Sequence, residues 1–409
     1  MPSGPGATYA AGTTVDEPEG RTVADQPSSY QSEIYLQGLA DQVPTFTTNG
    51  AVLERVAGER LDQGAFGYVA GAAGSGDTNR ANLAAFQRWR LVPRMLTGST
   101  VRDLATTILG TAMPAPVLLA PVGVQSILDP DGELATARAA AALGVPMVMS
   151  TASSFSIEDV AAASGDGPRW FQLYRPNDDA VCASILDRAR TVGFTVLVVT
   201  LDTWTLGWRP TDLDRAYLPF IRGVGTAVPF SDPEFRAGLA SPPEEDLTPA
   251  VLKWVPMFTG TDRTWDDLPF LREHWDGPIV LKGIQHVADA RLAAEAGMDG
   301  IIVSNHGGRQ VDGAIGALDV LPEIAAAVGD DITVLFDSGI RGGADVVKAL
   351  ALGARAVLLG RPYAYGLGLA GEAGVRHVLR GVLAETDLTL GLSGHRSVHD
   401  LTPDALRRT

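Results

Sequence analysis

The sequence predicts an α/β fold, specifically a closed barrel of eight parallel strands in which a helix follows each strand. Three observations support this prediction. Eight short apolar, β-branched runs follow one another from about residue 115 onward. Ala-rich amphipathic stretches lie between them, so that most spacings match one strand–helix unit. No Gly-rich fingerprint follows the first run, although the alternative, an open doubly wound sheet, usually carries one.

The elements are predicted in order along the chain. Residues 1–30 are rich in Gly, Pro, Ser and Thr and are expected to form a flexible tail, and 31–409 form the barrel domain. A helical pattern begins at Ile34 and continues to the segment around Tyr68. The predicted strands are 116–121, 145–150, 169–174, 195–202, 278–283, 300–305, 332–339 and 355–360. The clearest helix candidates between them are 132–144, 179–193, 287–297 and 343–353, several of which end on Gly.

One connection is much longer than the others. Residues 203–277, after the fourth strand, contain the Pro-rich stretches SDPEF and SPPEEDLTP. Because this insertion leaves the carboxyl end of a barrel strand, we expect it on the face that carries barrel active sites. It is either a spacer or oligomer contact, or a cover for the substrate, as long loops on that face often are.

Composition and charge exclude several classes of protein. Hydrophobic residues make up 45% and charged residues 20% of the 409, which is enough to build a large core. The net charge of −16 argues against binding nucleic acid or an anionic membrane surface. The single cysteine, Cys182, excludes an intrachain disulfide and a Cys-based zinc site, and we predict no metal. With no apolar run near ~18 residues and no secretory signal, a soluble cytoplasmic protein is expected.

Polar residues recur at the ends of the predicted strands. In a barrel these ends form one mouth, where function concentrates. A single polar strand end is usually only the start of a solvated loop, but a ring of them is harder to explain in that way. The polar residues are Ser150, Gln172, Tyr174, Thr200, Asp202, Lys282, Ser304, Asn305, His306, Asp337 and Arg361.

The last two strands end in motifs suited to a phosphate group. They are D-S-G-I-R-G-G at 337–343 and G-R-P at 360–362. Glycine lets the backbone approach a ligand, N–H groups at the following helix starts favour anions, and Arg341 and Arg361 add positive charge. The alternative is a helix-capping turn with surface arginines.

The sixth strand ends in S-N-H-G-G-R-Q at 304–310. His306 can take a proton near neutral pH, and Arg309 can clamp a carboxylate through two parallel bonds. Lys282 ends an apolar strand and could stabilise negative charge on a cofactor, or could simply pair with Asp202 or Asp337. Asp202 could instead pair with His306 and raise its basicity.

Over roughly residues 35–396 the chain resembles the FMN-dependent 2-hydroxy acid oxidase and dehydrogenase family. The most specific motif is S-N-H-G-x-R-Q, supported by Q-L-Y at 172–174, T-L-D-T at 200–203, K-G at 282–283, D-S-G-x-R at 337–341, G-R-P at 360–362 and L-S-G at 392–394. The N-terminal lead, F-G-Y-V-A-G at 66–71, A-P-V-G-V at 120–124 and the 206–220 segment resemble the lactate 2-monooxygenase branch.

The resemblance implies a role for each matching position. His306 would be the base, with Asp202 as its partner, and Arg309, Arg209, Tyr68 and Tyr174 would contact the substrate's carboxylate and hydroxyl. Lys282 would lie near the N1–O2 edge of the flavin. The other residues expected to hold FMN are Pro121, Val122, Gly123, Ser150, Gln172, Thr200, Ser304, Asp337, Ser338, Gly339, Ile340, Arg341, Gly360 and Arg361. The partners implied are a 2-hydroxy acid such as L-lactate, O₂ and further copies of the chain, in a tetramer or octamer.

Four departures from the family pattern bear on substrate and product. Gly123 stands where simple oxidases usually carry Ala, and Ala152 replaces a bulkier residue within S-T-A-S, which resembles the mandelate branch. Ala72 occupies a usual Gly, and Ser338 replaces a more common Gly. The expected reaction is oxidation followed by decarboxylation, with release of a 2-oxo acid and H₂O₂, on a larger substrate, as the alternative. Electron transfer to a quinone and a phosphate-binding barrel without redox chemistry are the other hypotheses.

Overall fold

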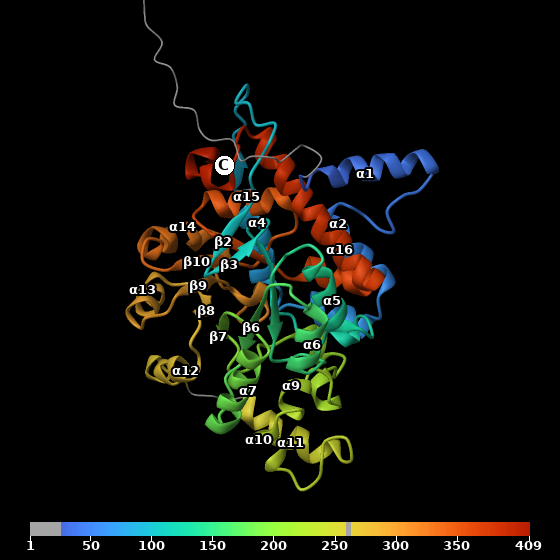
Figure 1. Ribbon diagram of the computed structural model, residues 1–409, viewed down its shortest axis with the longest axis vertical. Helices are drawn as coiled ribbons and strands as arrows, with labels where there is room; N and C mark the ends of the chain where they lie inside the picture. Colours follow the sequence, from blue (N-terminus) through green and yellow to red (C-terminus); the bar gives the residue numbers. More distant parts are fainter. Residues whose placement is uncertain (1–25, 259–262) are drawn as a thin grey trace, which may run out of the picture.

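A closed barrel of eight parallel strands forms the centre of the molecule in a computed structural model that describes residues 26–258 and 263–409. The strands are hydrogen-bonded to one another in chain order around the barrel (Figure 1). The predicted eight-stranded α/β barrel is therefore confirmed. Each predicted run contains or closely overlaps one observed strand. The strands are β4 (Val117–Leu119), β5 (Met147–Ser150), β6 (Arg169–Leu173), β7 (Leu197–Thr200), β8 (Ile279–Ile284), β9 (Gly300–Val303), β10 (Thr333–Phe336) and β11 (Ala356–Leu359).

Alternation along the strands divides their residues between two cores. Successive side chains of a strand point to opposite faces, so every second residue enters the barrel. The interior set packs into one buried cluster that includes Leu118, Val148, Trp170, Val198, Val280, Ile302 and Leu335. The alternate residues, such as Leu119, Phe171 and Phe336, belong to the larger cluster beneath the outer helices. Both faces are apolar because both are covered, as is usual for parallel sheets.

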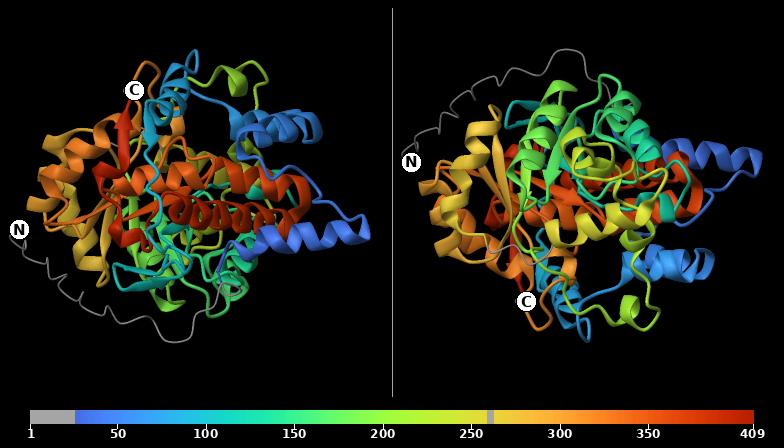
Figure 2. Two further views of the ribbon diagram at one scale, coloured as in Figure 1. Left: turned by 90° about the horizontal axis from the view of Figure 1, so that it is seen from above. Right: turned by 90° about the horizontal axis from the view of Figure 1, so that it is seen from below.

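Helices surround the barrel (Figure 2). Their starts are fixed locally: Ser156 accepts a hydrogen bond from the N–H of Asp159, and Asp178 accepts one from Val181, as N-cap residues do. All four helices predicted between strands are present. The outer helices are α5 (Gly132–Ala141), α6 (Ile157–Ser164), α7 (Asp179–Thr191), α12 (Leu268–His274), α13 (Val287–Glu295), α14 (Ala317–Val328), α15 (Gly343–Ala351) and α16 (Arg361–Leu392).

The amino-terminal end of the barrel is closed by a hairpin. Its strands, β2 (Thr106–Ile108) and β3 (Thr111–Met113), are antiparallel. Ile108 and Met113 pack into the interior cluster, and the indole N–H of Trp170 donates to Oγ1 of Thr111 at 2.9 Å. In a second small sheet, β1 (Trp89–Leu91), which follows α4, is antiparallel to β12 (Leu406–Arg408), the last strand of the chain.

From residue 26 onward, four α-helices precede the barrel: α1 (Ser29–Gln37), α2 (Gly50–Arg60), α3 (Gln63–Ala70) and α4 (Asp77–Gln87). The predicted tail, 1–30, lies outside the described residues except for 26–30. Helix α1 begins at Ser29, earlier than the predicted start at Ile34. The prediction missed the first turn because that turn shows no apolar periodicity. The helix is held to α16 by Tyr30, whose Oη lies 2.6 Å from His377 Nδ1, and projects from the body (Figure 1).

The predicted insertion is largely helical rather than irregular. It contains α8 (Pro210–Leu213), α9 (Ala227–Phe230), α10 (Pro233–Ala237) and α11 (Leu247–Phe258) before α12. Helix α12 packs against α7 as part of the outer ring, so the extra residues end before it. Figure 1 places α9, α10 and α11 together beyond one end of the barrel, near α7. Within the described residues, no helix combines the length and apolar character needed to cross a bilayer.

Candidate active site

A cavity of about 320 Å³ lies at the mouth formed by the carboxyl ends of the strands. Its volume falls within the range of small-molecule sites, ~300–1,000 Å³. The predicted site residues that line it are Tyr68, Pro121, Val122, Gly123, Ser150, Tyr174, Arg209, Lys282, His306, Arg309, Asp337, Ser338, Gly339, Ile340, Arg341, Gly360 and Arg361. The four that do not line it are Gln172, Thr200, Asp202 and Ser304, which are buried or half-buried behind the lining.

A layer of polar side chains forms the floor of the mouth. Each member lies two residues beyond an interior apolar residue, so the same alternation turns it into the barrel. Gln172 follows Trp170 in this way, and Lys282 follows Val280. Within the layer Ser150 Oγ donates to Gln172 Oε1 at 2.9 Å. The members are Ser150, Gln172, Thr200, Lys282, Ser304 and Asp337, all buried.

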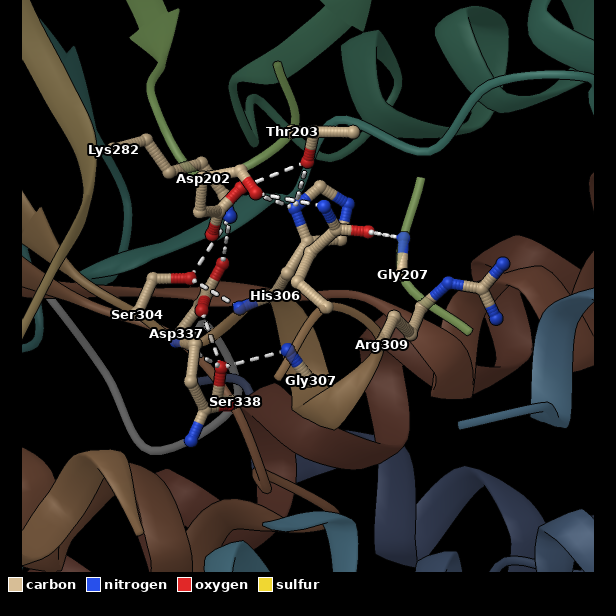
Figure 3. Close-up of polar contacts among 12 residues, drawn as sticks. Asp202, Thr203, Gly207, Lys282, Ser304, His306, Gly307, Arg309, Asp337 and Ser338 are labelled. Atoms are coloured by element: carbon tan, nitrogen blue, oxygen red, sulfur yellow. Dashed lines mark hydrogen bonds and ion pairs between the residues drawn. The ribbon is translucent and has the colours of Figure 1, made fainter. Parts of the chain in front are cut away.

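His306 is held in one orientation by two neighbours on the β7 end (Figure 3). Its Nδ1 lies 2.8 Å from Asp202 Oδ1 and 3.1 Å from Thr203 Oγ1. The hydroxyl of Thr203 also donates to Asp202 Oδ1 at 2.9 Å. The ring lines the cavity, and these contacts leave Nε2 as the nitrogen that can exchange a proton with a ligand.

Burial and charge set the protonation of this pair. Burial lowers the pKa of His306 below its ordinary value, and Asp202 opposes that shift. Burial alone would raise the pKa of Asp202, but His306, Lys282 and Thr203 outweigh it and hold the value at about 2. At neutral pH the imidazole is therefore neutral beside an ionised carboxylate, the form in which a histidine accepts a proton.

Lys282 is a buried cation at the floor of the cavity. Its Nζ lies 3.1 Å from Asp337 Oδ2 and donates to Ser304 Oγ at 2.9 Å. Burial would lower its pKa, yet Asp337 and Asp202 raise it above the ordinary value. The lysine therefore stays charged. The anticipated salt bridge to Asp337 is present, and the side chain still lines the cavity.

Ser338 ties the end of β10 to the His306 turn (Figure 3). Its Oγ accepts from the N–H of Gly307 at 3.0 Å and of Asn305 at 3.3 Å, and donates to Asp337 at 2.7 Å. Its backbone φ of 82° lies in the left-handed region that favours glycine. His306 also has a positive φ, 57°. Ser338, which replaces the family's usual glycine, is thus a strained residue that is hydrogen-bonded to the turn carrying His306.

Two arginines of the cavity wall hold the end of α3. Arg309 Nη1 donates to the carbonyls of Tyr68 at 2.6 Å and Gly71 at 2.8 Å. Arg361 donates to the carbonyls of Val69 at 3.0 Å and Gly71 at 2.9 Å. Cations are favourable at the carboxyl end of a helix, where the carbonyls lack partners. The Arg361 side chain, predicted to hold phosphate, is thus committed to α3 and to the carbonyl of Gly307.

Arg209 reaches the same wall from the insertion. Its Nε donates to the carbonyl of Arg309 at 3.0 Å and its Nη2 to Gln310 Oε1 at 2.6 Å. The amide of Gln310 donates in turn to the carbonyl of Asp202 at 2.7 Å. Burial and the nearby Arg209 lower the pKa of Arg309 to about 9, which leaves Arg309 charged at neutral pH. Two cations and two tyrosines, Tyr68 and Tyr174, whose pKa values burial raises, therefore face one cavity.

The loop after β4 presses against the loop after β5. A Cβ on Gly123 would lie 2.6 Å from the carbonyl oxygen of Ala152 and 2.7 Å from its Cβ. Both residues line the cavity. The two small residues noted in the sequence are thus a matched pair, because Gly123 is what lets the loops approach so closely.

Sequence reasoning missed an aromatic wall. Phe220, Trp254 and Phe258 line the cavity from the insertion, together with Leu218 and Val255. The rings of Phe220 and Trp254 are 5.0 Å apart, and those of Trp254 and Phe258 are stacked at 5.3 Å. Apolar residues at helical spacing in α11 were the only sign, and nothing in them indicated which face would meet the barrel. Thr203 was also missed, although it stood within a recognised motif.

The comparisons with known proteins agree with this geometry. The FMN-dependent dehydrogenase family matches residues 57–408. An FMN-dependent alpha-hydroxy acid dehydrogenase of Penicillium citrinum is 51% identical over 93% of this chain and 96% of its own. An L-lactate oxidase of Lysinibacillus sphaericus is 40% identical over 90% of this chain and 95% of its own. The crystal structure of a mandelate oxidase superposes with a TM-score of 0.77 at 39% identity, covering 88% and 98% of the two chains.

Barrel, cavity and relatives together define an FMN-dependent oxidoreductase of the class that oxidises 2-hydroxy acids. The chain belongs to the FMN-dependent dehydrogenase family, as its motifs indicated.

The cavity suits FMN on observations of its own. Of the buried donors that have no hydrogen-bond partner among the described residues, two belong to the predicted site: Gln172 Nε2 at the end of β6 and Arg341 Nη2 after β10. The pair from Arg341 to Glu54 is long, at 3.7 Å. A flavin offers carbonyl acceptors at its ring edge and a phosphate at its tail, which are the partners such donors require. Gly339, with φ of 104°, and the starts of α15 and α16 supply the close backbone approach that a phosphate needs.

Proposed function

We propose that the enzyme converts an (S)-2-hydroxy acid to the 2-oxo acid and uses O₂ as the final electron acceptor. FMN, when bound, accepts the two electrons that leave the substrate carbon. His306 takes the proton from the substrate through Nε2, and Asp202 stabilises the imidazolium that results. Arg309 and Arg209 bind the carboxylate. Tyr68 and Tyr174 contact the carboxylate and the hydroxyl group.

The observation that carries this proposal is the pairing of His306 with Asp202 inside a cavity that also holds two arginines. A neutral base and a cationic anchor are the two functions that removal of a proton from a hydroxy acid requires. The aspartate lies behind the ring, so it can stabilise positive charge there without occupying the substrate's place.

The residues proposed to hold FMN come from the carboxyl ends of all eight barrel strands. Pro121, Val122 and Gly123 would lie against the ring, and the floor residues Ser150, Gln172, Thr200 and Ser304 would hydrogen-bond its polar edge. The charged Lys282 would lie near the N1–O2 edge of the flavin and would stabilise negative charge there. The segment 337–341, with Gly360 and Arg361, holds the ribityl chain and phosphate. The side chain of Arg361 is engaged elsewhere, so it contributes mainly through its backbone.

We infer that the substrate carries a large apolar side chain. The wall of Phe220, Trp254 and Phe258 supplies apolar surface, and the small residues Gly123 and Ala152 line the same cavity. Lactate, with a methyl group, would leave this surface uncovered. An aromatic or branched 2-hydroxy acid would bury it, with roughly 25 cal/mol gained per Å² of apolar surface removed from water. A mandelate-like substrate therefore fits the cavity better than lactate does.

The product is the second part of the proposal. In a simple oxidase the 2-oxo acid and H₂O₂ both leave. In a lactate 2-monooxygenase the 2-oxo acid stays, and lactate plus O₂ gives acetate, CO₂ and water. Insertion residues between 203 and 258 line the cavity, and Arg209 fastens that segment to the catalytic turn. We propose that this segment also covers the bound substrate and so favours retention. We propose the monooxygenase outcome for small substrates and release of the 2-oxo acid for large ones, which hold the cover open.

The test is a panel of 2-hydroxy acids with complete product analysis. Lactate, 2-hydroxyisocaproate, mandelate and 3-phenyllactate are compared by kcat/KM, with 2-oxo acid, shortened acid and peroxide measured in the presence and absence of catalase. We expect higher kcat/KM for the larger acids. Trp254→Ala should erase that preference, whereas Trp208→Ala, at a side chain that is 72% exposed and outside the cavity, should preserve it. A wild-type preference for lactate contradicts the proposed substrate. Turnover with an artificial acceptor but not with O₂ would identify a dehydrogenase.

Three further predictions stay proposals. These are a domain spanning 31–409, assembly into a homo-oligomer and a cytoplasmic location. Gel filtration with light scattering tests the second.

A further inference from the structure

A buried glutamate that the proposed chemistry does not use stands behind the loops lining the cavity. Glu133 is in the first turn of α5 and is completely buried. Its Oε1 accepts hydrogen bonds from the N–H of Gln125 and of Ser154, both at 3.1 Å. Gln125 follows β4 and Ser154 follows β5, so one carboxylate oxygen bridges the two loops that carry Gly123 and Ala152.

The residue next to this bridge is strained. Val124 has φ of 61° and ψ of 28°, the left-handed conformation, which a β-branched residue rarely adopts. Such a conformation persists only where its surroundings hold it, and outliers of this kind gather at functional sites. Two contacts hold it here. The N–H of Val124 donates to the carbonyl of Ala152 at 2.8 Å, and the next N–H, of Gln125, donates to Glu133.

The strained residue connects the loop to the aromatic wall. The Val124 side chain is fully buried and packs against Ala152 and Phe220. The side chain of the next residue, Gln125, donates from Nε2 to the carbonyl of Val122 at 2.9 Å and accepts at Oε1 from the hydroxyl of Thr136 at 2.6 Å. The position of Val122, Gly123 and Ala152 in the cavity therefore depends on a backbone that Glu133 secures.

We infer that Glu133 is a positioning residue for the cofactor-facing wall of the active site: its Oε1 holds Val124 in the left-handed conformation and so fixes Val122, Gly123 and Ala152. The place of the acceptor oxygen matters in this role, and the charge does not. Burial raises the pKa of Glu133 to about 7, so the group is not committed to a charge at neutral pH, and its Oε2 has no hydrogen-bond partner among the described residues.

Two substitutions separate the position of the oxygen from its charge. Glu133→Gln keeps an acceptor oxygen at the same reach and removes the charge. Glu133→Asp keeps the charge and withdraws the oxygen by one methylene. The FMN-loaded enzymes are compared by visible circular dichroism of the bound flavin without substrate, and by the rate of anaerobic flavin reduction. We expect Glu133→Gln to match the wild type in both, and Glu133→Asp to change the flavin spectrum and slow reduction by about 10-fold or more, as misplacements of ~1 Å do.

A matched control tests whether loss of any buried carboxylate would have this effect. Asp232 is also fully buried, and its Oδ1 accepts from the N–H of Glu234 at 3.0 Å and of Phe235 at 3.1 Å, at the start of α10 outside the cavity. Asp232→Asn and Asp232→Ala should lower the temperature of unfolding without altering the flavin spectrum.

The opposite ordering, with Glu133→Asp like the wild type and Glu133→Gln impaired, would overturn the inference, as would wild-type behaviour of both. The inference about Glu133 rests on the proposed function, that is, on FMN binding and on the oxidation of a 2-hydroxy acid. Should no 2-hydroxy acid reduce even the wild type, the proposed function fails, while the spectra still decide the role of Glu133.

Discussion

Replacing Asp202 with Asn tests the partnership at the centre of the proposed mechanism. The substitution preserves the size of the side chain and removes the negative charge that lies 2.8 Å from His306 Nδ1. The amide can still accept a hydrogen bond from the ring, so His306 should keep its orientation. What disappears is the stabilisation of the imidazolium that forms when the substrate loses its proton.

The size of the effect follows from the geometry of the pair. Both side chains are more than four-fifths buried, at 18% and 17% exposure, so the hydrogen bond is charge-assisted and little screened. Bonds of that kind contribute about 1.5–3 kcal/mol. Since 1.36 kcal/mol corresponds to a factor of ten in rate, flavin reduction should slow by roughly 10- to 150-fold.

The pH dependence gives a second, independent check. Asp202 opposes the effect of burial and raises the pKa of His306, so its removal lowers that pKa further. The base must be neutral, and the acidic limb of kcat/KM reports its pKa in the free enzyme. That limb should therefore move to lower pH in Asp202→Asn, while the plateau falls.

The assay is anaerobic stopped-flow reduction by the best substrate of the panel, with the flavin-to-protein ratio measured beforehand. Thr203→Val is the companion variant, because it removes the hydroxyl near the same nitrogen without changing any charge. We expect the reduction rate of this variant to fall by only about threefold, in line with ~0.5–1.5 kcal/mol for a neutral hydrogen bond. A reduction rate in Asp202→Asn within twofold of the wild type, or an acidic limb moved to higher pH, would refute the reasoning.

Three other predictions follow from the site. His306→Gln should retain FMN, whose proposed phosphate contacts lie on other strands, and lose about 100-fold or more in the reduction rate; near-normal reduction would remove His306 from the mechanism. Ser338→Gly and Ser338→Ala both lose the hydroxyl that binds Gly307, but glycine also relieves the strain of the positive φ. Chemical unfolding should therefore show the Gly variant to be more stable than the Ala variant by about 1 kcal/mol. Equal stabilities of the two variants would show that no strain is stored at this position. Gly123→Ala should lower kcat/KM for large substrates more than for lactate, because the new Cβ meets Ala152, and a uniform change would contradict that.

The barrel and its mouth could be predicted because they depend on local patterns. Each apolar run specified a strand, and alternation determined that Lys282 and Asp337 would enter the same mouth. The pairing of Asp202 with His306 was one of two options that the sequence left open. The structure places Asp202 against His306 and Lys282 against Asp337.

The remaining features depend on contacts between distant segments, which no local pattern encodes. The direction of the Arg361 side chain depends on where the end of α3 lies, nearly three hundred residues earlier in the chain. The aromatic wall depends on which face of α11 meets the barrel. The strain at Val124 and Ser338 is invisible because residue identity alone does not report a backbone angle.

The aromatic wall has a consequence for how such enzymes diversify. Phe220, Trp254 and Phe258 all lie within residues 220–258, whereas His306, Lys282 and most of the proposed flavin contacts belong to the strand ends, and Thr203 and Arg209 precede this stretch. The residues proposed to recognise the substrate's side chain and those proposed to act at its hydroxyl carbon thus lie in separate segments of the chain. Exchange of that stretch between relatives would transfer substrate preference as a unit, and mutation within it can alter what the enzyme accepts while the reaction stays the same.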